Sequence, residues 1–501
     1  MILKSKLLRS ISVVVSFGLI AKILSFFIEM LTAYRIGATL ESDAYYVIYS
    51  IYGIISPMIS VGIWKVYMPA YKERCVLEEN LNANKITNQL FIIFEIISLI
   101  LFAIINTFPA IIISLFAPGF NEQTLEFAIP MLRIISLLFA IGVSHTFSSA
   151  ILQSHNQFKK SQLKVIMEHI PTLLYLLFWG RNLSVLGLTI SVVVGEFLTA
   201  IVMYVFGIKL YRFSFPKTLI DSETKAILKS VPAACLNSII NQLNNIIDKA
   251  FASTLMVGAI TCLNYGTKLR NFVDGLFSTA ISTAVFPTLT ELAVKKDNEK
   301  LEKFVTDYLS ILSFFLIAIT SYICVYSKDL VQILFGHGKF DYQSVIITSY
   351  VFLTYGFGLL AMCFTTLIND LFYIYKRADV LMYTSIVNIL LNIGLNYVFL
   401  EYYAVAGLSL ATSISLYITL FIKMRFIQKY ISIQKNIYFN IFSLIFTGTI
   451  SAFICYYFKS FIIFELNQII IGTILFIILF PSIELSINGY YRTLLSRYIR
   501  R

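Results

Sequence analysis

Long runs of apolar residues, each about the length needed to cross a bilayer, recur along the whole chain. A membrane-spanning helix needs about 20 mostly apolar residues. None of the runs shows the alternation of apolar and polar residues that is typical of a membrane β-barrel, so we expect helices, which satisfy their own backbone in lipid. The fourteen predicted spans are approximately 11–34, 44–64, 89–116, 129–153, 162–180, 184–208, 227–254, 259–286, 305–327, 344–371, 379–400, 404–427, 437–458 and 461–486.

The composition supports this interpretation. Of the 501 residues, 58% are hydrophobic and only 13% are charged, and the mean hydropathy is +0.81. A soluble chain carries about a quarter charged residues. The composition therefore excludes an ordinary water-soluble protein, a disordered chain and a fibrous chain. The predicted fold class is an all-α polytopic membrane protein with fourteen transmembrane helices.

The net charge of +12 is distributed unevenly between alternate loops. Most of the 39 Lys and Arg residues lie at the termini and in one set of connections, for example Lys159, Lys160 and Lys164. The opposite connections contain only Arg35, Arg181, Lys328, Lys339 and Lys459. Because cytoplasmic loops collect basic residues, both termini are predicted to be cytoplasmic. The charge is explained by topology, so no nucleic-acid partner is expected.

Two similar glycine-containing turns indicate an internal repeat. Residues 114–120 follow the third predicted span and residues 333–340 follow the ninth. We interpret them as equivalent turns of two six-helix lobes, which predicts an N-lobe over 1–215 and a C-lobe over 216–432. Residues 433–501 would add two helices and a basic tail. Duplicated lobes around a central cavity are typical of transporters.

The sequence has no equipment for the common enzymatic chemistries. It contains no P-loop, GxGxxG or HExxH motif, its four histidines share no ligand spacing, and its six cysteines are scattered. We therefore predict no cofactor and no metal. A membrane glycosyltransferase or polymerase would need a sizeable outer loop with catalytic carboxylates, and the predicted outer loops are short. A transporter is favoured over an enzyme.

The informative residues are charges inside the predicted spans. Lys22 and Glu29 lie seven residues apart in the first span and share one helix face, while Lys268 and Arg270 lie in the eighth. A charge near the middle of a bilayer is costly, so by default it faces a cavity and has a function. The alternative is a static ion pair or a side chain that reaches the interface. We favour that alternative for Arg133, Glu95, Glu168 and Glu196.

A cavity lined by cations from both lobes would most simply hold an anion, such as the phosphate or diphosphate of a lipid head group. Lysine binds phosphate as a point charge, without the bidentate geometry of arginine. The intramembrane carboxylates are compatible with coupling to H⁺ or Na⁺, because a carboxylate can bind either ion during a transport cycle.

Several motifs resemble the MurJ/MviN-type lipid II flippases of the multidrug/oligosaccharidyl-lipid/polysaccharide exporter superfamily. The first span and the turn after it carry Lys22, Glu29 and the sequence Gly-Ala-Thr-Leu-Glu-Ser-Asp-Ala-Tyr-Tyr over 37–46. Further similar stretches follow in the same order, at 116–120, 265–269, 286–289 and 334–340. Fourteen spans with both ends inside is also the layout of that family.

The resemblance implies roles for particular residues. The family's first-helix arginine falls on Lys22 and its eighth-helix arginine on Lys268, while Lys65 is the cation nearest to its second-helix arginine. Together with Arg270, these are the predicted substrate-binding residues. Glu29 and Asp43 are the predicted gating or coupling residues. A further family arginine falls on Ile28, so this chain has fewer positive charges at these positions and carries Lys where the family carries Arg. A relative of the family that carries another glycolipid therefore remains an alternative.

The predicted function is that of a flippase, which moves a polyprenyl-diphosphate-linked saccharide similar to lipid II from the inner to the outer leaflet by alternating access. The chain is expected in the bacterial cytoplasmic (inner) membrane, acting as a monomer, with membrane lipid as its other partner. The alternatives are a flippase for an O-antigen or exopolysaccharide precursor and a drug/ion antiporter of the same superfamily.

Overall fold

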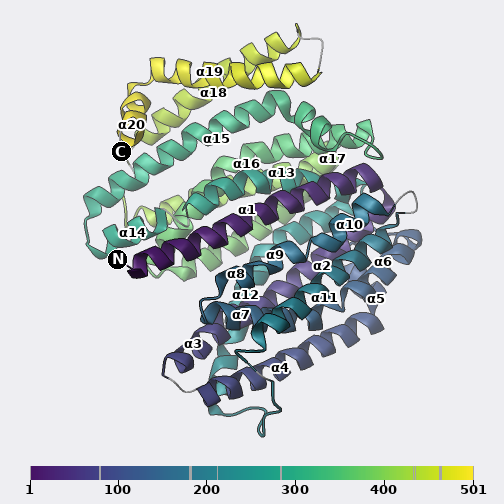
Figure 1. Ribbon diagram of the computed structural model, residues 1–501. Helices are drawn as coiled ribbons and strands as arrows, with labels where there is room; N and C mark the ends of the chain where they lie inside the picture. Colours follow the sequence, from purple (N-terminus) through teal and green to yellow (C-terminus); the bar gives the residue numbers. More distant parts are fainter. Residues whose placement is uncertain are drawn as a thin grey trace. The chain divides into compact units, whose positions relative to one another are not determined.

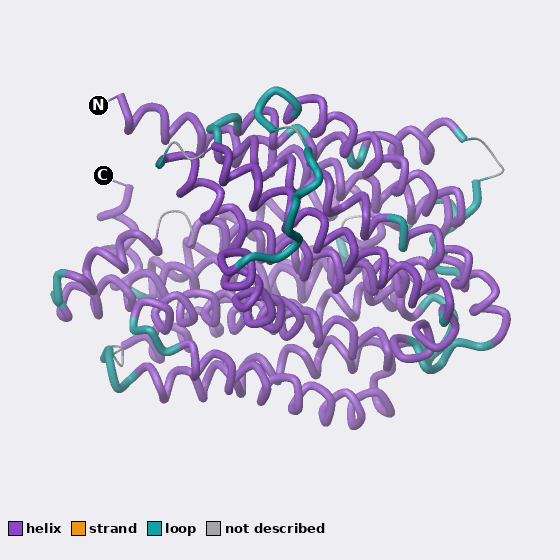
Figure 2. Tube along the Cα trace, turned by 90° about the horizontal axis from the view of Figure 1, so that it is seen from below, coloured by secondary structure: helices purple, strands orange, loops and turns teal. Residues whose placement is uncertain are grey.

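The computed structural model describes residues 2–77, 80–179, 183–211, 213–281, 285–432, 434, 436–461 and 465–499. Over these ranges every regular segment is a helix and none is a strand, as Figures 1 and 2 show. The prediction of an all-helical chain is confirmed. Arg181, one of the basic residues used to predict the topology, lies outside the described residues.

The chain forms two compact units. Unit 1 contains residues 1–261 and 338–340, and unit 2 contains residues 262–337 and 341–501. The division differs from the predicted lobe boundary at residue 215, because helix α12 (Ser222–Ala252) packs against helix α2 (Leu40–Gly62) of unit 1. The three-part division inferred from the repeat stays a prediction. The other helices of unit 1 are α1 (Ile2–Ile36), the π-helix η1 (Ile63–Tyr67), α3 (Met68–Val76), α4 (Asn80–Thr107), α5 (Pro109–Phe116), α6 (Glu122–Ile135), α7 (Leu138–Ser154), α8 (Phe158–Gln162), α9 (Lys164–Met167), α10 (Ile170–Phe178) and α11 (Val185–Gly207).

Unit 2 begins within α13 (Ala259–Ala280), which starts three residues before the division. Its other helices are α14 (Phe286–Val294), α15 (Asn298–Phe335), α16 (Tyr342–Ile374), α17 (Ala378–Ile427), α18 (Asn436–Lys459), α19 (Glu465–Ile487) and α20 (Gly489–Ile499). Helices α18 and α19 lie side by side and both pack against α15. Aromatic residues fill this contact: the rings of Phe314 and Phe480 meet edge to face with centroids 5.3 Å apart. In lipid such close packing, rather than exclusion of water, holds helices together.

Ten helical segments within the described residues are long and apolar enough to cross a membrane. The fourteen predicted spans differ from these ten in two ways. The predicted spans 379–400 and 404–427 both fall within α17, in which two helical stretches meet at the non-helical residue Ala404 (φ 47°, ψ −128°). The predicted spans 162–180, 227–254 and 259–286 fall on short helices separated by turns or on the more polar helices α12 and α13. The count of fourteen therefore stays a prediction.

Polar side chains cap the first turns of several helices in unit 1. The Thr39 hydroxyl accepts a hydrogen bond from the Ser42 amide, and the Ser42 hydroxyl accepts one from the Thr39 amide, which is a capping box. Asn121 and Ser184 cap α6 and α11 in the same general way. Each cap pairs an N–H that has no partner within its helix, so the sequence fixes where these helices begin.

Asp221 caps α12 and also connects it to α4. Its Oδ1 accepts from the Thr224 amide at 2.9 Å, and its Oδ2 lies 2.8 Å from Lys85 Nζ. The hydrogen bonds from Lys85 and Thr224 hold the pKa of the Asp221 carboxyl well below its usual range. This contact stabilises one end of unit 1 only while Asp221 is ionised.

Candidate functional site

Asp43, the acidic residue near the end of the 37–46 motif, is a buried carboxylate with hydrogen bonds to both of its oxygens. Asp43 is 4% exposed. Its Oδ2 accepts from the Gly258 amide at 2.7 Å, and its Oδ1 accepts from the Thr261 amide at 2.8 Å and the Thr261 hydroxyl at 2.6 Å. The Ser42 hydroxyl contacts the same Thr261 hydroxyl at 2.9 Å. These bonds join the start of α2 to Gly258, just before α13, and to Thr261 in the first turn of α13.

Two glycines make this junction possible. Gly258 has φ +86°, and a Cβ there would lie 2.9 Å from the Ala38 Cβ. Gly37 has φ +75°, and its Cβ would lie 2.4 Å from the Lys339 carbonyl oxygen. Residues with a side chain rarely adopt this left-handed conformation, and here the space is also absent. The segment around Lys339 is held in place because its amide donates to the Tyr34 carbonyl at 2.9 Å.

Glu29, the other predicted gating residue, is half-buried on α1. The Tyr46 hydroxyl donates to Glu29 Oε2 at 2.8 Å. The backbone carbonyl of the same tyrosine accepts from Lys249 Nζ at 3.2 Å, and this ammonium also donates to the Ser50 hydroxyl at 2.6 Å. The predicted gating residues Glu29 and Asp43 thus both act on the first turns of α2, one through Tyr46 and the other through its own side chain.

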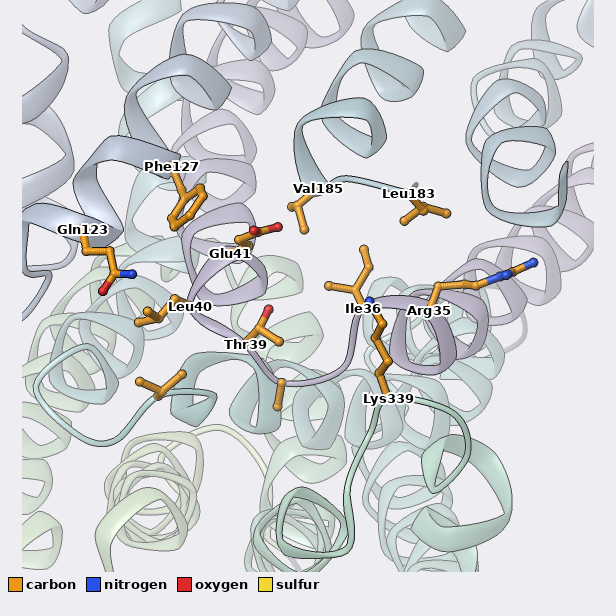
Figure 3. Close-up of a pocket in the computed structure, with 12 residues that line it drawn as sticks. Arg35, Ile36, Thr39, Leu40, Glu41, Gln123, Phe127, Leu183, Val185 and Lys339 are labelled. Atoms are coloured by element: carbon orange, nitrogen blue, oxygen red, sulfur yellow. The ribbon is translucent and has the colours of Figure 1, made fainter. Parts of the chain in front are cut away.

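A pocket of about 470 Å³ opens where α1 ends and where α2, α6 and α11 begin. Figure 3 shows the residues that line it, among them Glu41, Lys339 and Arg35, whose guanidinium extends away from the turn at Thr39. The lining carries two cations and one carboxylate beside apolar side chains. It forms part of unit 1 and includes none of the predicted substrate-binding residues.

The predicted substrate-binding residues are divided between the two units. Lys22 is exposed on α1 in unit 1, and Lys65 lies on η1, with its side chain outside the described residues. Lys268 is half-buried on α13 in unit 2. Joint binding of one diphosphate by Lys22 and Lys268 stays a prediction.

Arg270 is also on α13 but is only 8% exposed. Its Nε and one terminal nitrogen donate to the Asn271 side-chain oxygen at 3.2 and 3.1 Å. The guanidinium carbon lies 4.3 Å from the ring centroid of Tyr355, which is a close cation–π contact. The structure therefore gives Arg270 partners within unit 2, whereas Lys22 presents an exposed side chain.

Sequence analysis did not single out several buried polar groups. Glu484 on α19 is 0% exposed, and it accepts from the Ser443 hydroxyl at 3.0 Å and the Thr447 hydroxyl at 2.6 Å. His145 on α7 lies 3.0 Å from Glu196 on α11, a glutamate that we expected to be static. In both cases the signal was an ionisable residue inside an apolar run. Within the described part of the chain, no group of three or more His, Cys, Asp or Glu side chains is placed to hold a metal ion.

Comparison with solved structures identifies the fold. The fold matches the inward-facing conformation of a multidrug resistance MATE family transporter of the MOP superfamily, with a TM-score of 0.65 over 83% of this chain and 96% of that one, at 16% identity. It also matches a structure described as lipid II flippase MurJ in an inward closed conformation, with a TM-score of 0.81 over 96% of this chain and 99% of that one, at 23% identity. The chain therefore has the same fold as these two structures.

Sequence comparison identifies the family. The family model described as "Lipid II flippase MurJ" matches residues 32–483, so the chain belongs to this family. It is 26% identical over 409 residues to a probable lipid II flippase MurJ of Buchnera aphidicola subsp. Baizongia pistaciae, covering 80% of this chain and 79% of that protein. It is 22% identical over 415 residues to a protein of the same description from Rickettsia prowazekii, covering 82% and 81%. The family resemblance in the motifs is confirmed, and the chain is a multi-pass protein of the bacterial inner membrane.

Proposed function

We propose that this chain is a transporter that moves lipid II, a polyprenyl-diphosphate-linked saccharide, from the inner to the outer leaflet of the cytoplasmic membrane. The observation that carries the proposal is the family match over residues 32–483, which extends through both compact units. A solved lipid II flippase that aligns with 96% of the chain supports the same architecture.

The diphosphate would be bound by cations from both units: Lys22 and Lys65 from unit 1, and Lys268 and Arg270 from unit 2. A lysine or arginine charge near the middle of a bilayer costs about 3 kcal/mol on insertion scales, so binding of an anionic phosphate at such a position is favourable. Lys22 is the strongest candidate because its side chain is exposed. Arg270 would act on the head group less directly, since it already contacts Asn271 and Tyr355.

Alternating access would proceed by movement of the two units about the cation-lined cavity, with the polyprenyl tail remaining in lipid beside α18 and α19. The exposed apolar side chains of these two helices support that path; they include Phe439, Phe442, Phe446, Ile474 and Ile477. Asp43 would hold the start of α2 against Gly258 and Thr261. Glu29 would gate access to the cavity through its contact with Tyr46. A single chain would suffice, because both units that supply cations belong to it.

The finer topology is part of the same proposal: fourteen spans and cytoplasmic termini. A variant without the six native cysteines provides the background for labelling. A cysteine at Glu122 or Gln343 should react with an impermeant maleimide added to intact cells, and a cysteine at Asp297 should react only after the cells are opened. Labelling of the 297 position in intact cells would contradict the orientation.

A second candidate is a flippase for another polyprenyl-diphosphate saccharide, such as a surface-polysaccharide precursor. The observation that favours it is the reduced charge, because two positions where the family carries arginine hold Lys22 and Ile28. A drug/ion antiporter has weaker support, since the MATE structure aligns with a lower TM-score than the lipid II flippase.

Complementation of a bacterial strain depleted of its lipid II flippase tests the proposal. We expect growth with this chain and none with the Lys22→Ala, Lys268→Ala double variant at equal membrane levels. Lys→Arg at both positions should retain much of the activity, because it preserves the charge. Failure of the unaltered, membrane-inserted chain to support growth would favour the second candidate.

A further inference from the structure

A cluster of ionisable side chains inside unit 1 has no part in the head-group binding proposed above. It is contributed by four segments: α2, α7, α11 and the stretch from α9 to the start of α10. Its members are Tyr52, His145, Lys164, Glu168 and Glu196. All of them belong to unit 1, so their mutual geometry is defined.

The centre of the cluster is a close histidine–glutamate pair. His145 Nε2 lies 3.0 Å from Glu196 Oε2, and the two side chains are 10% and 13% exposed. The Tyr52 hydroxyl points to the other carboxylate oxygen at 3.5 Å. Both ring nitrogens of His145 are buried, and neither makes a hydrogen bond of standard geometry among the described residues. An imidazole in this position gains a favourable contact when it is protonated.

Lys164 and Glu168 complete the cluster. Both interact electrostatically with Glu196, and they lie four residues apart in sequence. His169 approaches Glu168 with 3.9 Å between Nε2 and Oε1, at a half-buried position. With both glutamates ionised, Lys164 charged and the histidines neutral, the cluster carries a net charge of −1. Because a net charge is costly in a low-dielectric interior, uptake of one proton makes the cluster neutral and is favoured.

Other charges near the cluster are either engaged with α2 or outside the buried centre. Glu29 of α1 accepts from Tyr46 of α2, and Lys249 of α12 donates to Ser50 of α2. On α6, which packs against α2 and α11, Arg133 is exposed. The remaining neighbouring charges are Glu126 on α6 and Lys159 and Lys160 on α8, all exposed, and Glu95 on α4, which is half-buried. The charge balance within the cluster is therefore set mainly by its own members.

The cluster has a direct connection to an irregular part of the helix that follows α2. Lys164 Nζ lies 5.6 Å from the ring centroid of Trp64, which belongs to the π-helix η1 between α2 and α3. Single π-turns in otherwise regular helices are frequent at functional sites, because the extra residue makes the backbone easier to rearrange. A change in the electrostatic attraction between Lys164 and the two glutamates would therefore alter the cation–π contact of Lys164 with Trp64.

We propose that His145, Glu196, Glu168 and Lys164 form a proton-binding site whose charge state sets the conformation of η1. The site would bind H⁺ when the cluster closes and release it when the segment around Trp64 rearranges. The site would make H⁺ the coupling ion of the proposed flippase. The role of the proton in transport rests on the proposed function, whereas proton binding by the cluster does not.

The two tryptophans of the chain, Trp64 and Trp179, allow a spectroscopic test on the purified full chain. In a Trp179→Phe background, Trp64 is the only tryptophan. In lipid nanodiscs its emission should change in one sigmoidal step between about pH 5 and about pH 9, the range in which histidine-centred sites titrate. The step should be absent with Glu196→Gln and absent or displaced by about one pH unit or more with His145→Gln.

Glu95→Gln is the matched control, because it removes another half-buried glutamate from unit 1 and should leave the step unchanged. If Glu196→Gln does not fold, Glu168→Gln serves as the second variant, and it should displace the step. Emission that does not vary with pH, or a step that persists in both the Glu196→Gln and His145→Gln variants, would overturn the proposal.

Transport measurements separate this proposal from the proposed function. Lipid II flipping in proteoliposomes should depend on pH in the unaltered chain, and this dependence should be lost with His145→Gln. If the unaltered chain flips lipid II and both forms respond to pH identically, the proton site is wrong and the flippase function stands. If the unaltered chain flips no lipid II but the emission of Trp64 changes with pH as expected, the flippase function is wrong and the proton site stands.

Discussion

Unit 1 contains two buried acidic sites that differ in how their carboxylates are satisfied. Asp43 accepts hydrogen bonds from two backbone amides and one hydroxyl, all from donors that keep their protons at any physiological pH. Glu196 instead lies 3.0 Å from an imidazole nitrogen of His145. A carboxylate bound by fixed donors stabilises one structure, whereas one that shares its proton with a partner can change state. The first arrangement suits a structural junction, and the second suits a coupling site.

The largest expected effect of a substitution is at Asp43. Asp43→Asn places an amide nitrogen where one carboxylate oxygen now accepts a hydrogen bond, so either the Gly258 or the Thr261 amide loses its acceptor in a buried position. We expect a loss of about 3 kcal/mol in the free energy of unfolding. Thermal unfolding in detergent checks this, with Glu41→Gln on the same helical turn as the control. An unchanged melting temperature for Asp43→Asn would remove the distinction between the two sites.

A smaller loss is expected from Gly258→Ala at the same junction. The new Cβ would require a left-handed backbone and would lie 2.9 Å from the Ala38 Cβ, which together cost about 2 kcal/mol. The matched control is Gly53→Ala on α2, where nothing lies within 4 Å of an added Cβ, and which should be neutral or stabilising by about 0.5 kcal/mol. Equal melting temperatures for the two variants would show that the junction is not rigid.

Glu196→Gln should change stability little but alter the response to pH. The glutamine keeps the shape and the contact with Tyr52, and loss of a buried charge offsets loss of the ionic contact, so we expect a change within about 1 kcal/mol. The flipping rate should become independent of pH between about pH 6 and about pH 8. A stability loss as large as that of Asp43→Asn would mean that Glu196 is a structural residue.

The smallest effect is expected for Asp221→Asn, at a carboxylate that is well satisfied but partly exposed. Asparagine retains the helix cap and loses only the ion pair with Lys85, so the expected loss near neutral pH is about 0.5 kcal/mol. The folded-state pKa of Asp221 is lowered, so its stabilisation is present above the unfolded-state value of about 4 and disappears as the pH falls below it. The melting temperatures of the two proteins should therefore converge in acid. A difference that grows as the pH falls would contradict this assignment.

The sequence indicated the fold class and the acidic residue of the junction, but not its partners. Apolar runs and loop charges predict a helical membrane protein because lipid permits few other structures. Asp43 stood out because it lies in the 37–46 stretch that resembles a motif of the flippase family. Its partners Gly258 and Thr261 lie more than two hundred positions along the chain, and no local pattern connects residues at that separation.

The number of spans and the ionisable cluster were harder to predict for physical reasons. Within α17 the backbone is interrupted at Ala404, the first residue of the second of two predicted spans, so that two spans lie within one helical segment. Each member of the cluster was visible as an isolated residue, but Glu196 was interpreted as static because nothing in the sequence places His145 beside it. Contacts between helices decide which intramembrane charges are paired, and those contacts depend on packing that hydropathy does not encode.

The most direct test of the account is translocation of purified lipid II in proteoliposomes that contain only this chain. Lipid II should reach the opposite leaflet at a rate well above that of protein-free vesicles. The Lys22→Ala, Lys268→Ala double variant, reconstituted in equal amounts, should lose this activity, while the Lys→Arg double variant should retain much of it. Full activity of the double alanine variant would contradict the diphosphate site, and lipid II that stays in its original leaflet with the unaltered chain would contradict the proposed function itself.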